Sequence, residues 1–142
     1  MSCKIPLYLP KNVAELGPNL PWKPWIWAAV TIESAKQMPR LEALKSCGAL
    51  NKFIQFEPLL GKIPDFNTDG IDWSAVGGEA GPSARPMQAD WVRHLRDISS
   101  GIPFLFKSWS SFGGSTGRGG NRENLLDGKR WDEFPPSLLT NV

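Results

Sequence analysis

Residues 71–87 read IDWSAVGGEAGPSARPM, and this stretch decides the fold that we expect. An apolar run over residues 72–76 leads into two glycines and Glu79, and a loop rich in glycine, proline and serine follows, with Arg85 in it. A strand buried on both faces of a parallel sheet has this pattern where it leaves the sheet at its carboxyl end. Ligands of parallel sheets bind outside those carboxyl ends, so this loop is also where we expect a functional site.

Similar apolar runs predict further strands on both sides of this stretch. Residues 25–32 read WIWAAVTI, which is apolar throughout and partly β-branched, and residues 53–56 and 103–106 are shorter runs of the same kind. A fifth run, residues 5–9, contains Pro6, which has no N–H to donate. We therefore expect an edge strand there.

Two helices are predicted between these strands. The first lies within about residues 35–47, with Ser34 as its cap. Because Pro39 is tolerated only in a first turn, we expect this helix to begin late, near Met38. The second follows Asp90, where apolar residues again recur on one helical face. Residues 59–70 are too few and too rich in Pro, Gly, Asn and Asp for a full crossover helix.

This alternation predicts an α/β protein with an open parallel sheet of about four to five strands, right-handed crossovers and flanking helices. Asp127-Gly128 predicts a C-terminal hairpin over residues 125–131. We expect one domain of 142 residues in three parts. They are a proline- and tryptophan-rich entry segment (1–24), a βα core (25–110) and a glycine-rich loop with the hairpin tail (111–142).

The composition excludes several classes of protein. With 41% apolar and 21% charged residues, wholesale disorder is not expected. There is no apolar run of membrane-spanning length and no signal-peptide pattern, so we expect a cytoplasmic protein without membrane association. The two cysteines, Cys3 and Cys47, form no CxxC or CxxxCxxC motif, which argues against a zinc or iron–sulfur site and for free thiols.

Each of the four core strands is followed by, or ends in, a charged residue: Glu33, Glu57, Glu79 and Lys107. If the strands are parallel, these side chains gather at one rim of the sheet, and three carboxylates with one ammonium make a plausible site. The alternative is that each charge is a solvated strand end. For Arg85, on the loop beside them, the alternative is a salt bridge to a neighbouring carboxylate.

Other candidate residues lie away from this rim. His94, the only histidine, lies on a predicted helix, so we expect a surface role rather than acid–base work. The run GGSTGRGG over residues 113–120 lacks the GK[ST] end of a phosphate loop and reads as a flexible loop. Nucleic-acid binding would use the basic and aromatic residues of the tail, although a net charge of +2 argues little for it. These residues are Arg118, Arg122, Lys129, Arg130 and Trp131.

Six stretches of the chain carry a family resemblance: LPWKPWIWAAVTIES (20–34), FIQFEPLLGKI (53–63), GIDWSAVGGEAGPSARPM (70–87), DWVRHLRD (90–97), IPFLFKSW (102–109) and LLDGKRWDEFP (125–135). Through them the chain, from about residue 16 to 134, resembles the phage protein family named for gene products 37 and 68. Members of that family look like radical S-adenosylmethionine proteins with a partial TIM-like barrel. The resemblance therefore implies a half barrel for this chain.

The resemblance also implies a cofactor site, with one departure. The family's three-cysteine motif for a [4Fe–4S] cluster has no counterpart here, and Cys3 and Cys47 cannot replace three closely spaced ligands. We therefore expect no self-sufficient enzyme, no catalytic residue and no metal ligand. S-adenosylmethionine remains the cofactor to consider, and its candidate contacts are Glu33, Glu57, Gly77, Gly78, Glu79, Arg85 and Lys107.

Three functions follow as hypotheses. The first is a phage or mobile-element accessory protein that acts by binding, either to itself or to a host or phage protein that covers the open sheet. Inhibition of a host defence system would be one such role. The second is the S-adenosylmethionine- or nucleotide-binding part of a split radical S-adenosylmethionine enzyme. The third is nucleic-acid binding.

Overall fold

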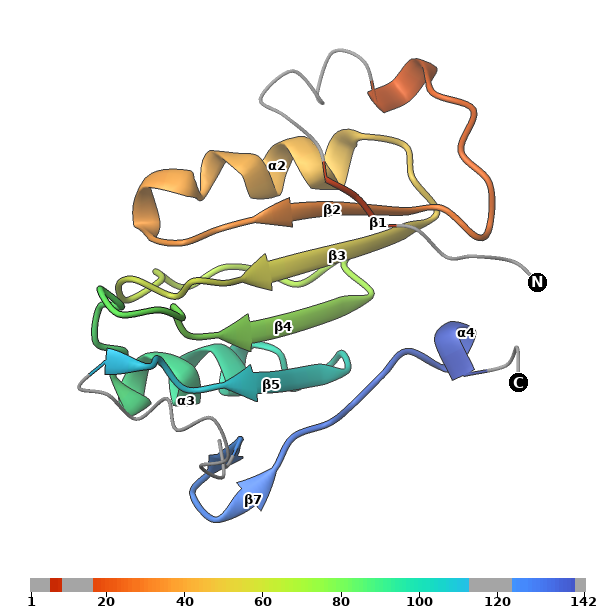
Figure 1. Cartoon of the computed structure of the whole chain (residues 1–142). Helices are drawn as coiled ribbons and strands as arrows, with labels where there is room; N and C mark the ends of the chain where they lie inside the picture. Colours follow the sequence, from red (N-terminus) through yellow and green to blue (C-terminus); the bar gives the residue numbers. More distant parts are fainter. Residues whose placement is uncertain (1–5, 9–16, 113–123, 140–142) are drawn as a thin grey trace.

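The computed structural model describes residues 6–8, 17–112 and 124–139, and for residues 6–8 the backbone alone. Its centre is a five-stranded sheet in which every neighbouring pair is parallel and the strands follow one another in sequence order (Figure 1). The strands are β1 (Pro6–Tyr8), β2 (Trp27–Thr31), β3 (Asn51–Phe56), β4 (Trp73–Gly77) and β5 (Phe104–Ser108). The predicted open parallel sheet is confirmed, and in the described part of the chain it does not close into a barrel.

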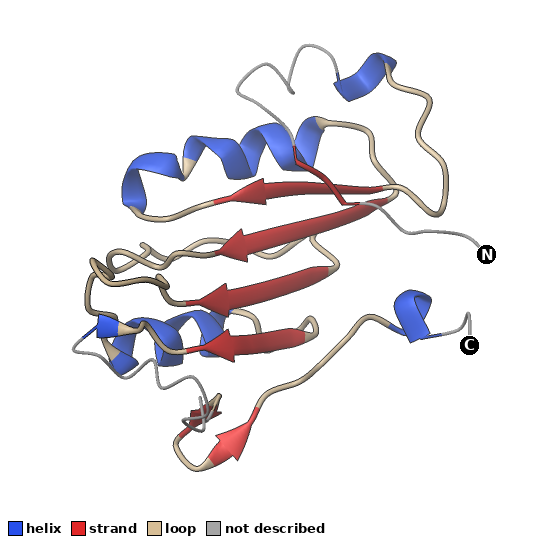
Figure 2. Ribbon diagram, in the orientation of Figure 1, coloured by secondary structure: helices blue, strands red, loops and turns tan. Residues whose placement is uncertain are grey.

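Helices cover one face of this sheet (Figure 2). Between β2 and β3 lie a short 3-10 turn, η2 (Ala35–Gln37), and the helix α2 (Pro39–Ser46). Between β4 and β5 lies α3 (Ala89–Ile98), whereas β3 and β4 are joined by residues 57–72 without a helix. A sheet in sequence order with right-handed crossovers places all its crossovers on the same face, as in a barrel wall.

The local sequence explains where the first helix begins. Pro39 is its first residue, the position where a missing N–H costs nothing. Ser34 opens the preceding turn, and its backbone N–H and hydroxyl both donate to Gln37 Oε1. The late start near Met38 is therefore confirmed.

The main core lies between the helices and the sheet. It joins alternate strand residues such as Val30, Ile54 and Val76 to the apolar stripes of the two helices. Those stripes are Leu41 and Leu44 of α2 and Val92 and Leu95 of α3. The buried Cys47 belongs to the same cluster as a free thiol.

The opposite face of the sheet carries no helix of the crossovers, and we call it the helix-free face. Its amino-terminal half is apolar, with Trp27, Ala29, Phe53 and Ala75 all buried. The chain's own tail covers this half, because Leu138 of the short helix α4 (Pro136–Leu139) packs against it. Figure 1 shows the tail running from β7 to α4, which lies on the side of the molecule where the strands begin.

Segments from the two ends of the chain lie at the two edges of the sheet. At one edge lies β1, confirmed as an edge strand that contains Pro6. At the other edge, the tail runs antiparallel to β5: Phe106 N–H donates to Trp131 O and Glu133 N–H donates to Phe104 O.

The hairpin before this segment is also confirmed. It pairs β6 (Leu125–Leu126) with β7 (Lys129–Arg130), and both turn residues, Asp127 and Gly128, have positive φ. Another 3-10 turn, η1 (Gly17–Asn19), lies in the entry segment. Cys3 falls outside the described residues. Within the described part, no helix is long and apolar enough to cross a membrane.

Candidate functional site

The charged residues predicted at the strand ends do lie at one rim. Glu33 follows β2, Glu57 follows β3, Glu79 follows β4, and Lys107 is the penultimate residue of β5. Because these strands are parallel, all four positions fall at the carboxyl-end edge of the sheet, to which the arrows point in Figure 1. Their role in ligand contact stays a prediction.

The centre of the rim is an ion pair that spans a whole strand. Lys107 Nζ on β5 donates to Glu57 Oε2, and Gln55 Nε2 donates to the same oxygen. The strands β3 and β5 lie two strand spacings apart, roughly 9 to 10 Å. The strand between them contributes Gly77, and a side chain there would lie 2.8 Å from the Glu57 carboxylate. The pair exists because β4 has no side chain at this point.

The second glycine has a different packing role. A Cβ on Gly78 would lie 2.1 Å from the backbone nitrogen of Ser110, so the segments after β4 and β5 touch through their backbones. Both glycines are buried. Their observed partners are parts of the protein itself, and any ligand contact would have to come from their backbone groups.

Glu79 and Arg85 form a two-armed ion pair. Arg85 Nε and Nη2 donate to the two carboxylate oxygens at 2.9 and 2.7 Å, and the Arg85 backbone N–H donates at 2.8 Å. These hydrogen bonds from Arg85 lower the pKa of Glu79 from 4.5 to about 2, so the carboxylate is charged at neutral pH. The salt bridge that was the alternative for Arg85 is therefore present.

The third acid is paired as well. Arg40 of α2 lies 3.1 Å from Glu33, and the same guanidinium also donates to the carbonyl of Thr31. Each of the three carboxylates thus has a cation of its own, and the rim as a whole is neutral. Among the described residues no group of three or more metal-ligating side chains occurs.

Two serines connect the loop after β4 to the segment after β5 by hydrogen bonds, which the sequence did not reveal. Ser111 Oγ accepts from Gly81 N–H, and Ser111 N–H donates to Glu79 O. Ser110 Oγ donates to Arg85 O and accepts from the backbone N–H of Phe112, whose side chain is exposed. Nothing in the run SWSSF (residues 108–112) signals these contacts, because they depend on β4 and β5 lying side by side.

His94 lies on α3, away from the rim residues, as expected. Its Nε2 is 3.2 Å from Asp65 Oδ1 but makes no hydrogen bond of good geometry with a described residue. The histidine lines an open depression of about 490 Å³ between α3 and the loop that precedes β4. The depression is lined by Lys62, Gln88, Asp90, Trp91, Arg93, His94 and Asp97.

The basic residues proposed for nucleic-acid contact are largely engaged in the tail. Lys129 Nζ lies 3.9 Å from the centre of the Trp131 ring, and Arg130 pairs with Asp132 at 3.5 Å. Arg118 and Arg122 fall outside the described residues.

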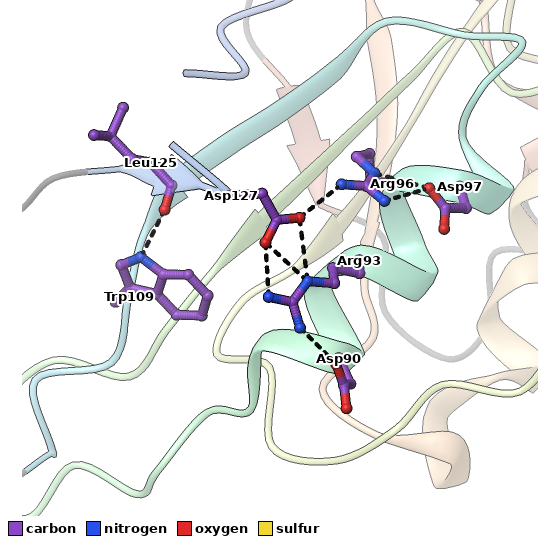
Figure 3. Close-up of polar contacts among 7 residues, drawn as sticks. All are labelled: Asp90, Arg93, Arg96, Asp97, Trp109, Leu125 and Asp127. Carbon is purple, nitrogen blue, oxygen red and sulfur yellow. Dashed lines mark hydrogen bonds and ion pairs between the residues drawn. The ribbon is translucent and has the colours of Figure 1, made fainter. Parts of the chain in front are cut away.

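A charge network attaches the hairpin to α3 (Figure 3). Arg93 and Arg96 both donate to the carboxylate of Asp127 in the hairpin turn, and these bonds lower the pKa of Asp127. The same two arginines also donate to carboxylates on α3, Arg93 to Asp90 and Arg96 to Asp97. The network positions the tail that covers β5 and the helix-free face.

Comparison with known proteins gives one positive result. No curated protein and no solved structure matches the chain. The family described as "Protein of unknown function (DUF5131)" matches residues 4–135, nearly the whole chain, and the protein therefore belongs to that family.

Proposed function

We propose that this protein acts by binding a protein partner at the carboxyl-end rim of its sheet, as a cytoplasmic accessory protein of a phage or mobile element. The partner is a second copy of the chain or a protein of the phage or its host, and inhibition of a host defence system is one such role. The resemblance to the phage protein family supports the setting. The pairing of every rim carboxylate supports binding over self-sufficient catalysis.

One observation carries this proposal: Ser110 holds an exposed arginine beside an exposed aromatic residue. Its hydroxyl donates to the Arg85 carbonyl and accepts from the Phe112 backbone N–H, so the two residues lie close together on hydrogen-bonded loops. The Arg85 side chain is 60% exposed and Phe112 is 56% exposed. Arginine and aromatic residues dominate the energy of protein interfaces, and rigid loops lower the entropy lost on binding.

The carboxyl-terminal half of the helix-free face also supports binding of a partner. The tail fills the apolar amino-terminal half, so a partner is not needed there. The carboxyl-terminal half retains the partly exposed Glu57–Lys107 pair, whose charges set orientation and specificity at an interface.

The test compares Phe112→Ala and Arg85→Ala with Leu50→Ala, a matched exposed apolar residue at the amino-terminal end of β3. Sedimentation velocity over a range of concentrations measures self-association, and affinity capture from infected host cells measures other partners. We expect both rim variants to weaken the association at least tenfold and the control to leave it unchanged. Equal association of all three variants and the unaltered protein would contradict the proposal.

The second candidate is binding of S-adenosylmethionine or a nucleotide at the same rim. It is favoured by the cluster of Gln55, Glu57 and Lys107, which offers donors and acceptors at the carboxyl ends of β3 and β5, on either side of β4. Calorimetric titration with S-adenosylmethionine and with ATP tests it. We expect Lys107→Ala to weaken binding at least tenfold and Lys23→Ala, an exposed lysine of the entry segment, to have no effect. Absence of heat from either ligand would remove this candidate.

A further inference from the structure

The amino-terminal half of the helix-free face contains an aromatic cluster, which we define as Trp27, Phe53 and Trp73. Phe53 stacks on Trp73 with ring centres 4.5 Å apart, and Trp27 meets Trp73 edge-on at 6.3 Å. Ala29 and Ala75 lie beside these rings on the same face. Two aliphatic side chains, Leu105 of β5 and Leu138 of α4, pack against the cluster.

One polar atom of this cluster has no partner. Trp27 is only 3% exposed, and its indole Nε1–H finds no acceptor among the described residues. By contrast, the indole of Trp73 donates to Glu133 O at 3.0 Å, and that of Trp109 donates to Leu125 O at 3.1 Å. A buried donor without an acceptor is costly, so Trp27 favours any state that supplies one.

The cover over this cluster is lightly attached. Up to Glu133 the tail is bound to β5 by backbone hydrogen bonds, but beyond it the contacts are those of side chains. Phe134 lies 5.5 Å from the Trp73 ring and Leu138 packs on the cluster, while Phe134 and Leu139 remain substantially exposed. With only four residues, α4 also has little helical stability of its own.

From these observations we propose that α4 is a displaceable cover over a binding site for a planar aromatic molecule with a hydrogen-bond acceptor. The ligand packs against the stacked Phe53–Trp73 pair in place of Leu138, and its acceptor takes the N–H of Trp27. The cluster itself contains no charged side chain, so the ligand is neutral. Glu133 keeps the tail anchored to β5 while the segment after it moves. This site is separate from the rim and does not rest on the function proposed there.

The test uses two probes of the same shape on the full chain. 2-Acetylnaphthalene carries a carbonyl acceptor, whereas 2-ethylnaphthalene does not. Tryptophan emission is followed during titration with each probe. Trp25→Phe removes a half-exposed tryptophan outside the cluster, so the emission change on binding should persist in this variant. We expect saturable binding of both probes, with the acetyl compound about fivefold tighter, the effect of one hydrogen bond.

Two variants then separate the donor from the cover. Trp27→Phe keeps an aromatic ring without the N–H, and it should bind both probes with equal affinity. Leu138→Ala loosens the cover, and it should bind both probes severalfold more tightly with the preference unchanged. Absence of saturable binding, a preference that survives in Trp27→Phe, or an affinity that is unchanged or lower in Leu138→Ala would each overturn the proposal. Because Leu138 lies on the tail, its variant tests the site even if replacement of Trp27 prevents folding.

Discussion

The two halves of the helix-free face solve the same problem in opposite ways. Both halves belong to a sheet face that the crossover helices leave bare. At the amino-terminal half the strand residues are Trp27, Phe53 and Ala75, and the chain brings its own tail across to cover them. At the carboxyl-terminal half lie Gln55, Gly77 and Lys107, and here Gln55 and Lys107 both donate to the carboxylate of Glu57.

The two halves should therefore differ in how much each contributes to the stability of the fold. Apolar burial stabilises in proportion to the area removed from water, whereas partly exposed ion pairs contribute little to folding. The amino-terminal half should therefore contribute more to the stability of the sheet than the charged carboxyl-terminal half. Substitutions in the two halves should differ accordingly.

The largest effect on the free energy of unfolding is expected within β3, because this strand contributes one residue to each half of the face. Phe53→Ala removes a buried ring from the stack on Trp73 and should lower the free energy of unfolding by about 3 to 5 kcal/mol. Gln55→Ala, two residues further on the same face, should cost no more than about 1.5 kcal/mol, because it removes a partly exposed hydrogen bond. Urea unfolding measures both, and equal losses would refute the division into halves.

The next effect concerns the close approach behind the rim. Gly78→Ala places a methyl group 2.1 Å from a backbone nitrogen, so the loops must separate at a cost of about 1 to 3 kcal/mol or more. Gly101→Ala is the control, because nothing lies within 4 Å of its added methyl group, and it should change stability by no more than about 0.5 kcal/mol. A Gly78 variant as stable as the control would mean that the loops can part freely.

The features that could be predicted from the sequence are those that depend on residues close together in the chain. The strands of the core and the start of α2 at Pro39 follow from local patterns, and parallel order then gathers Glu33, Glu57 and Glu79 at one rim. The partners of these acids were not predictable, except that Arg85 lies six residues from Glu79. The pairing of Glu57 with Lys107 requires β3, β4 and β5 to be neighbours. The packing of Leu138 joins the tail to a cluster of residues from β2, β3 and β4, far away in the sequence.

The pH dependence of stability sharpens the comparison at the rim alone. Hydrogen bonds from Arg85 lower the pKa of Glu79 from 4.5 to about 2, so the unfolded chain binds this proton more readily than the folded one. The stabilisation is complete above about pH 4.5 and is lost as the pH falls towards 2. Glu79→Gln should therefore show a weaker fall in urea midpoint between pH 4.5 and 2 than the unaltered protein. An identical fall in both proteins would assign the acid sensitivity to other groups.

The smallest effect is expected for the ion pair that crosses β4. Lys107→Met removes one partner of a pair that is partly open to water, so the loss should stay below about 1 kcal/mol. A double-mutant cycle with Glu57→Gln isolates the interaction between the two side chains. Because water and ions reach this half of the face, the coupling energy should shrink further in 1 M salt, where the screening length is about 3 Å. A coupling that is large and insensitive to salt would place the pair in a water-excluded setting, and the carboxyl-terminal half would then share in stabilising the sheet.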